Sequence, residues 1–229
     1  MIPIRDDNPA QRTPIVTLGL IGLCLAAFLW QLAQGGPGMQ IAIYRLGMIP
    51  AVLLGTEPAE IAAVPPALTL FTSMFLHGGW LHLLGNLLYL WIFGNNVEDR
   101  LGHGRYLALY LGTGLAAAAA QILPDPRSTI PMVGASGAIS GVLGAYVVLF
   151  PHARILVAIP LGLVFFRYVR AIWVLGIWFG LQIVSAVMAP AGSGVAWWAH
   201  VGGFVAGFLV VRPLRPRPGR RRPRRGPWG

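Results

Sequence analysis

The chain contains no lysine, one cysteine and few charged residues of either sign. Arg, Asp and Glu together make up 10% of its 229 residues, whereas about a quarter of a soluble domain is charged. The single cysteine, Cys24, excludes an intrachain disulfide and a cysteine-based metal site. Hydrophobic residues supply 56% of the chain, and the mean hydropathy is +0.68. These values together indicate an integral membrane protein.

Six apolar segments separated by loops are typical of membrane-spanning helices, each of which needs roughly 20 mostly apolar residues. The six expected spans cover residues 15–33, 81–93, 106–123, 136–150, 172–188 and 197–211. A charged turn is expected over residues 95–100, after the second span. The apolar run 155–166 is broken by Pro160 and Gly162 and is too short to cross the bilayer. We therefore expect that run to lie in the membrane interface.

The expected fold class is an all-α membrane protein with a six-transmembrane-helix bundle. The bundle occupies residues 15–211 and follows an N-terminal segment, residues 1–14, that we expect in the cytoplasm. Residues 212–229 are rich in proline and arginine and cannot build a hydrophobic core. We therefore expect them to form a disordered, basic cytoplasmic tail.

The arginine distribution predicts how the spans are oriented. Six spans place both termini on one side, and arginine-rich loops favour the cytoplasmic side. Fifteen of the 17 arginines then lie inside, and only Arg45 and Arg127 lie outside. We therefore expect a multi-pass protein of a bacterial inner membrane with cytoplasmic termini. Nucleic acid is not an expected partner, because the arginines flank apolar segments or crowd into the tail and do not cover a soluble surface.

Two polar residues at membrane depth are the candidate catalytic groups. Ser136, in the run Gly134-Ala135-Ser136-Gly137, opens the fourth span from the outer side, and His200 lies just below the outer end of the sixth. Polar groups at this depth are costly and often functional, and a serine nucleophile with a histidine base is the minimum for acyl transfer. Taken alone, the serine is more readily explained as a helix N-cap, and the histidine can be explained as a buried side chain in simple helix packing.

Glycines on the same two spans predict that the serine and the histidine meet. Gly203 and Gly207 follow His200 at i+3 and i+7, so the three share one helical face. Gly137 and Gly141 form a similar small-residue pair beside the serine. Faces of small residues let membrane helices pack closely. We therefore expect the fourth and sixth spans to be in contact at the level of the candidate pair.

The second span adds two hydrogen-bond donors. His82 and Asn86 stand at i and i+4 on one face, and with the backbone N–H of Ser136 they could form an oxyanion hole. The alternative is a metal site built from His77, His82 and His200. The spacing of His77 and His82 does not place them on one helical face, no carboxylate stands nearby, and H-E-x-x-H is absent. We therefore expect no metal and no cofactor.

Together these motifs resemble the rhomboid family of intramembrane serine proteases. The matching elements are His77 … His82-Leu83-Leu84-Gly85-Asn86, Gly134-Ala135-Ser136-Gly137, and Ala199-His200 … Gly203 … Gly207, within about residues 67–207. The resemblance implies a compact six-helix bundle whose water-filled cavity opens to the outside. It implies Ser136 as nucleophile and His200 as general base, without a carboxylate. It assigns oxyanion roles to His82, Asn86 and the Ser136 backbone, and places His77 at the cavity wall.

Two positions depart from the family pattern. Some members have Trp-Arg before the second span, where this chain has Leu68-Thr69. Some have a tyrosine four residues after the nucleophile, stacked on the histidine, and here that position is Ser140. Another group must therefore hold the histidine. The expected candidates are close packing over Gly203 and an aromatic neighbour, Trp197 or Trp198.

The resemblance implies an intramembrane serine endopeptidase that cleaves single-span membrane proteins near the outer face. It also makes Glu98 a structural carboxylate on the cytoplasmic side, and we expect the fifth span and the loop 190–194 to act as gates.

One alternative is a non-catalytic rhomboid-like module that binds or escorts membrane proteins, which would lack the serine or the histidine. A transporter would need ionisable groups across the bundle, and the spans hold none besides His82 and His200.

Overall fold

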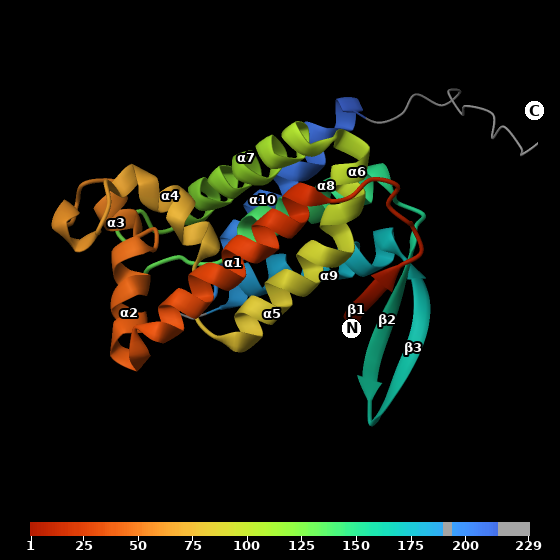
Figure 1. Cartoon of the computed structure of the whole chain (residues 1–229), viewed down its shortest axis with the longest axis horizontal. Helices are drawn as coiled ribbons and strands as arrows, with labels where there is room; N and C mark the ends of the chain where they lie inside the picture. Colours follow the sequence, from red (N-terminus) through yellow and green to blue (C-terminus); the bar gives the residue numbers. More distant parts are fainter. Residues whose placement is uncertain (190–193, 215–229) are drawn as a thin grey trace, which may run out of the picture.

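The computed structural model describes residues 1–189 and 194–214, and the chain folds mainly into helices (Figure 1). The tail after residue 214, which is expected to be disordered, and most of the expected gating loop 190–194 lie outside the described residues. The first expected span, α1 (Ile15–Ala33), and the last, α10 (Trp197–Val211), have the predicted bounds. Hydrophobic pattern alone therefore located these two helices.

Helix α8 (Ser136–Leu149) lies at the centre of the bundle. Every residue from 137 to 148 is buried, and α7 (His103–Ile122), α9 (Ala171–Met188) and α10 pack against it (Figure 1). The helix is rich in Gly, Ala and Ser, and such small side chains let several helices approach one axis without leaving voids. The helix that begins at the candidate serine is thus the most enclosed element of the fold.

Close contact between α8 and α10 depends on glycine. A Cβ at Gly203 would collide with the carbonyl oxygen of Gly137, and a Cβ at Gly207 would collide with that of Gly141. The contact expected from the two small-residue faces is therefore present. Gly137 and Gly141 themselves face α7, however, because added Cβ atoms would meet Ala117, at 2.7 Å from its Cβ, and Thr113, respectively.

Two described helices, α1 and α9, are long and apolar enough to cross a membrane. A third crossing results if residues 66–75 and 80–101, which meet at a bend of 81°, form a single broken span. Helices α8 and α10 are apolar but shorter. The membrane-spanning character of the chain is thus supported, and the number of six spans stays a prediction.

The second expected span extends further than predicted. Helix α5 (Trp80–Tyr89) continues through the π-helical turn Leu90–Gly94 into α6 (Asn95–Leu101). The prediction of a charged turn over residues 95–100 is therefore wrong. The chain leaves the helix only at Gly102, whose φ of 79° favours glycine. Polar composition suggested a loop here, but the residue that ends the helix comes later.

The long connection between α1 and α5 is folded into short helices. These are α2 (Gly35–Leu46), α3 (Pro50–Leu53) and α4 (Thr69–Thr72), joined by 3₁₀ turns and irregular segments. They gather at one end of the bundle, far from the N-terminal strand (Figure 1).

A three-stranded antiparallel sheet at the other end corrects the all-α prediction. Its order is β1 (Ile2–Asp6), β2 (Arg154–Leu161) and β3 (Leu163–Arg170). The break at Gly162, with φ of 75°, is the hairpin turn between β2 and β3. The flanking residues are largely β-branched and aromatic, which favours strands. Because β1 pairs with β2, the N-terminal segment belongs to this sheet and does not stand apart from the bundle.

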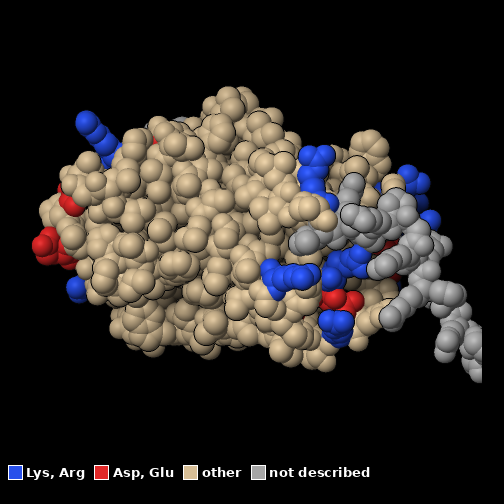
Figure 2. All heavy atoms as spheres, turned by 90° about the horizontal axis from the view of Figure 1, so that it is seen from above, with Lys and Arg blue, Asp and Glu red and all other residues tan. Residues whose placement is uncertain are grey.

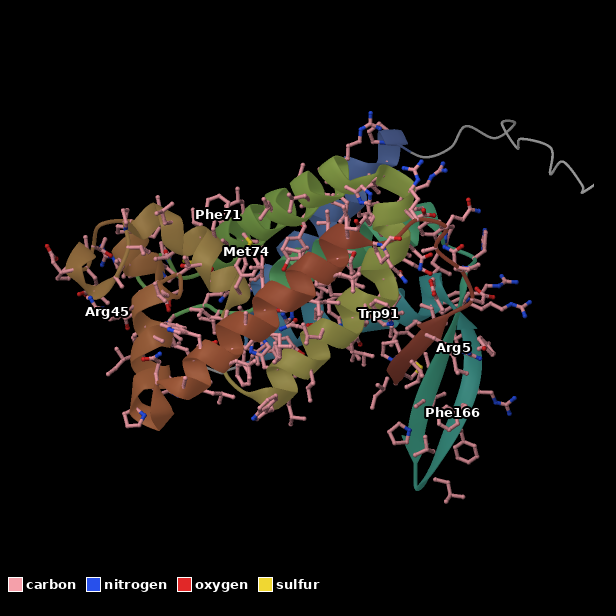
Figure 3. The ribbon with its side chains drawn as sticks, viewed as in Figure 1. Arg5, Arg45, Phe71, Met74, Trp91 and Phe166 are labelled. Carbon is pink, nitrogen blue, oxygen red and sulfur yellow. The ribbon has the colours of Figure 1, made fainter. Side chains whose placement is uncertain are left out.

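The β2–β3 hairpin projects from the bundle (Figure 1), and its aromatic side chains are exposed, among them Phe166 (Figure 3). Ile155 and Val157, at its base, are buried in the main core. Phe166 is 60% exposed, and Leu163 is 73% exposed. Apolar side chains on a projecting hairpin agree with the interfacial position expected for this run, which stays a prediction.

Buried polar contacts attach the N-terminal region to the bundle. Glu98, only 1% exposed, accepts the N–H of Val16 at 2.9 Å and both the N–H and the hydroxyl of Thr17 at 2.8 and 2.7 Å. It thereby serves the free N–H groups at the start of α1, in keeping with its expected structural role. The carboxylate also lies 2.6 Å from Nδ1 of His103.

Asp6 makes a second attachment, between β1 and the C-terminal end of α8. Its carboxylate accepts the hydroxyl of Tyr146 at 2.6 Å and the side-chain amide of Asn96 at 2.7 Å. Burial raises the pKa of the Asp6 carboxyl above its ordinary value, and the hydrogen bond from Tyr146 only partly opposes this shift.

Charged side chains gather at the two ends of the molecule. Figure 2 shows a broad middle zone without them on the face in view. Arg45 and Arg5 lie at opposite ends in Figure 3, and which of these ends faces the cytoplasm stays a prediction. A charge-free band between two charged ends is the surface that a bilayer requires.

Candidate active site

The structure brings Ser136 and His200 into hydrogen-bonding contact. Nε2 of His200 lies 2.8 Å from Oγ of Ser136, although 63 residues separate them in the chain. The serine is the first residue of α8, and the histidine lies in the first turn of α10. Gly203, one turn after His200, packs directly against the backbone of Gly137, and this close packing holds the two helices at the separation that the serine–histidine contact requires. The distance suits proton transfer from the hydroxyl to the imidazole.

The backbone beside the serine requires glycine. Gly134 has φ of 121°, a conformation that other residues rarely adopt, and its N–H donates to the carbonyl of Ser73 at 2.8 Å. A Cβ at Gly134 would lie 2.6 Å from Nε2 of His82. The tight turn therefore sets the serine at the start of a helix, where backbone N–H groups are free to bind a negative charge.

His82 approaches this turn from α5, which also carries Asn86. The N–H of Gly78 donates to Nδ1 of His82 at 3.3 Å, so the proton of the neutral ring is on Nε2, the atom beside Gly134. Asn86 is buried one turn further along, and its Nδ2 group has no partner among the described residues. A buried unpaired donor costs about 1–3 kcal/mol. Asn86 thus offers an unpaired donor on the helix that carries His82, and its role in an oxyanion hole stays a prediction.

A partly open cavity of about 750 Å³ lies over the pair. Its wall comes from the start of α5, from the turn before α8 and from the segment before α10. The lining residues are Gly78, Gly79, Trp80, Leu81, His82, Val133, Ser136, Gly194, Val195, Ala196 and His200. His77, expected at the cavity wall, is not among them. It is fully buried, and its ring lies 5.1 Å from that of His82.

The groups that hold His200 include two that were not expected. The ring of Trp197, an expected neighbour, meets the imidazole edge-on at 5.9 Å, and Trp178, which was not expected, lies 6.1 Å away. The second unexpected group is Gln182 of α9, whose Oε1 lies 2.7 Å from Nδ1 of His200. Ser140, at the position of the family's tyrosine, bonds the carbonyl of Ser136. Polarity within an otherwise apolar span was the signal that could have identified the glutamine.

No group of three or more His, Cys, Asp or Glu side chains within residues 1–189 and 194–214 is placed to hold a metal ion. The three histidines considered for a metal site are arranged differently, because His200 faces the serine while His82 faces the turn at Gly134.

Comparison with known proteins assigns the chain to a family. The Rhomboid domain family model matches residues 66–217, and the chain therefore belongs to the rhomboid family. Membership implies an integral membrane protein and suggests a protease that acts within the membrane. The match covers the helices that carry all the candidate residues described above.

Several curated proteins are similar to most of this chain. Rhomboid protease GluP of Bacillus subtilis is 32% identical over 165 residues, which are 71% of this chain and 29% of that protein. Rhomboid protein 1, mitochondrial, of Saccharomyces cerevisiae is 28% identical over 184 residues, 75% of this chain and 50% of that protein. RHOMBOID-like protein 5 of Arabidopsis thaliana is 32% identical over 162 residues, 70% and 48% of the two chains. The chain thus spans half or less of the length of these relatives.

Proposed function

We propose that the protein is an intramembrane serine endopeptidase that uses Ser136 and His200 as a catalytic dyad. The observation that carries this proposal is the 2.8 Å contact between Oγ of Ser136 and Nε2 of His200 at the floor of an accessible cavity. Family membership supports it, since GluP, one of the similar proteins, is named a rhomboid protease.

In the proposed reaction, Oγ of Ser136 attacks the carbonyl carbon of a peptide bond while Nε2 of His200 accepts the hydroxyl proton. The tetrahedral intermediate collapses as the imidazolium gives that proton to the leaving nitrogen, so the C–N bond breaks and an amine product departs. A water molecule then attacks the acyl-enzyme with His200 again as base. The second step releases a carboxylic acid and restores the serine.

The proposed oxyanion hole combines one backbone donor and two side chains. The N–H of Ser136 is free at the start of α8. Nε2–H of His82 lies at the adjoining turn, and the unpaired Nδ2 of Asn86 lies one turn behind it. Donors that are already in position lose little energy to reorganisation when the charge develops.

The proposed substrates are single-span membrane proteins, cut near the outer face. The cavity lies at the ends of α8 and α10 that are distant from the sheet and from Arg5, which the arginine distribution assigns to the cytoplasm. Lipid excludes water, and a helical peptide bond is shielded by its own hydrogen bonds. A substrate segment with small or helix-breaking residues would unwind most readily into such a cavity.

The proposal is tested with the purified chain, a tagged single-span reporter and detergent micelles. We expect cleavage by the wild type and by Ser185→Ala, a matched change at a serine of α9 that is not among the residues lining the cavity. Ser136→Ala and His200→Ala should each remain folded and lose cleavage. Normal cleavage by Ser136→Ala would exclude the dyad. Binding of the reporter without cleavage by the wild type would favour the escort alternative.

A further inference from the structure

We propose that Gln182 is a positioning residue that fixes the tautomer of His200 and so makes Nε2 the basic atom. This inference rests on the proposed dyad. Gln182 belongs to α9 and is only 7% exposed. Its Oε1 lies 2.7 Å from Nδ1 of His200, whose other ring nitrogen contacts Ser136. Two successive hydrogen bonds therefore connect Gln182 of α9, His200 of α10 and Ser136 of α8.

The direction of this hydrogen bond follows from the second contact of the glutamine amide. Nε2 of Gln182 lies 3.3 Å from the carbonyl oxygen of Trp178, one turn earlier in α9. A carbonyl can only accept, so the NH₂ group must face Trp178, and Oε1 must face the histidine. Oε1 in turn can only accept, which requires a proton on Nδ1 of His200. A neutral imidazole carries one ring proton, so Nε2 is left with its lone pair directed at the serine.

The opposite tautomer would prevent catalysis. With the proton on Nε2, the imidazole could not take the hydroxyl proton of Ser136. An isolated imidazole can carry the proton on either nitrogen. Because the amide is itself held by the α9 backbone, Gln182 selects one form and also limits rotation of the ring. It resembles the third member of a catalytic triad in place and orientation, but it brings no charge to stabilise the imidazolium.

Loss of the Gln182 side chain should lower kcat without changing KM. Gln182 lies behind the histidine and is not among the residues that line the cavity, so its loss should leave substrate binding unchanged. The chemical step should slow, because part of the histidine population would hold the wrong tautomer or orientation. We expect kcat to fall by about 10- to 100-fold, no more than the lower end of the 10²–10⁴ that a positioned general base contributes, because the base itself is retained, with KM nearly constant.

The test compares three variants of the full chain in detergent. Gln182→Met keeps the length of the side chain and removes the acceptor. Gln182→Glu keeps an acceptor at the same place. Gln121→Met is the matched control, because Gln121 also ties α10 to another helix, through the N–H of Ala199 at 3.2 Å, without contact to the imidazole. Each variant is assayed for kcat and KM on the reporter and for ¹⁵N chemical shifts of labelled histidine, with His200→Ala providing the assignment.

The wild type and Gln182→Glu should show a pyrrole-like Nδ1 in His200, with kcat within about threefold of each other. Gln182→Met should lose that signature together with activity, and Gln121→Met should keep it. Unchanged kcat and shifts in Gln182→Met would overturn the inference, as would equal losses in both methionine variants with unchanged shifts. If Gln182→Met does not fold, loss of the pyrrole-like Nδ1 in Gln182→Glu would refute it. Absence of cleavage by the wild type would refute the dyad instead, since the shifts are read without substrate.

Discussion

Replacing Gly203 by alanine should separate the two helices that carry the candidate pair. The added Cβ would collide with the carbonyl oxygen of Gly137, and the Gly137 carbonyl carbon would lie 3.1 Å away. Both are backbone atoms next to Ser136, so neither can rotate aside. Helix α10 must therefore move away from α8, and His200, one turn from the substitution, moves with it.

The loss of stability in Gly203→Ala is measured by comparison with the same substitution at a glycine that has space around it. Gly112, on α7, is exposed, and a Cβ there would meet nothing within 4 Å. Alanine is favoured over glycine in a helix by about 1 kcal/mol at either position, whereas overpacking at Gly203 costs about 1–3 kcal/mol. We expect Gly112→Ala to be neutral or stabilising and Gly203→Ala to be less stable than it by about 1–3 kcal/mol.

Activity should respond more strongly than stability. The serine–histidine contact is 2.8 Å long in the wild type, and a displacement of about 1 Å near a reacting group can cost about 10²-fold in rate. Thermal unfolding in detergent and kcat/KM on the reporter measure the two effects. Wild-type stability and turnover in Gly203→Ala would show that the α8–α10 contact does not set the geometry of the site.

Asn86→Ala and His82→Ala should each lower kcat, by up to about 10²–10³ for a lost oxyanion donor, with little change in KM; wild-type kcat in both would leave them a packing role. Truncation after Leu214 should preserve proteolysis in detergent, because the tail is predicted on the side opposite the cavity; a folded but inactive truncation would refute that placement. Burial raises the pKa of Asp6 in the folded state above its value in the unfolded chain. Between these two pKa values the folded state binds more protons than the unfolded state, so the free energy of unfolding should fall as pH rises through that interval. Asp6→Asn should flatten this part of a melting-temperature profile against pH, and an unchanged profile would contradict the assignment. If the hairpin lies in the interface, a spin label at Phe166→Cys, in a Cys24→Ala background, should be shielded from water-soluble paramagnetic relaxation agents in vesicles. Full accessibility of the label to these agents would show that the hairpin lies in water.

The parts of the site that were predicted from sequence depend on regular helices and on glycine. The bounds of α1 and α10 follow from hydrophobic pattern, and the arginine distribution places Ser136 and His200 at one depth. The spacing of Gly203 and Gly207 then predicts which helices approach. Each of these inferences uses a local rule, and each requires only that the helix continue to the next residue of the motif.

The parts that were missed depend on partners far away in the chain. The run 155–166 is apolar on both sides of Pro160, so it shows neither the helical nor the alternating period. Its strand structure becomes definite only when β1 pairs with β2. Gln182 carries no motif, and its role depends on the rotation of α9 relative to His200. Sequence shows that a polar residue stands in that span, but not which way it faces.

Covalent labelling of Ser136 distinguishes a catalytic dyad from a serine and a histidine that only pack together. A fluorophosphonate reacts with a serine whose hydroxyl is activated by a neighbouring base, and peptide mass spectrometry locates the adduct. We expect a single adduct on Ser136 of the detergent-purified wild type, and no adduct in His200→Ala. An adduct on another serine, or equal labelling of Ser136 with and without the histidine, would contradict the dyad.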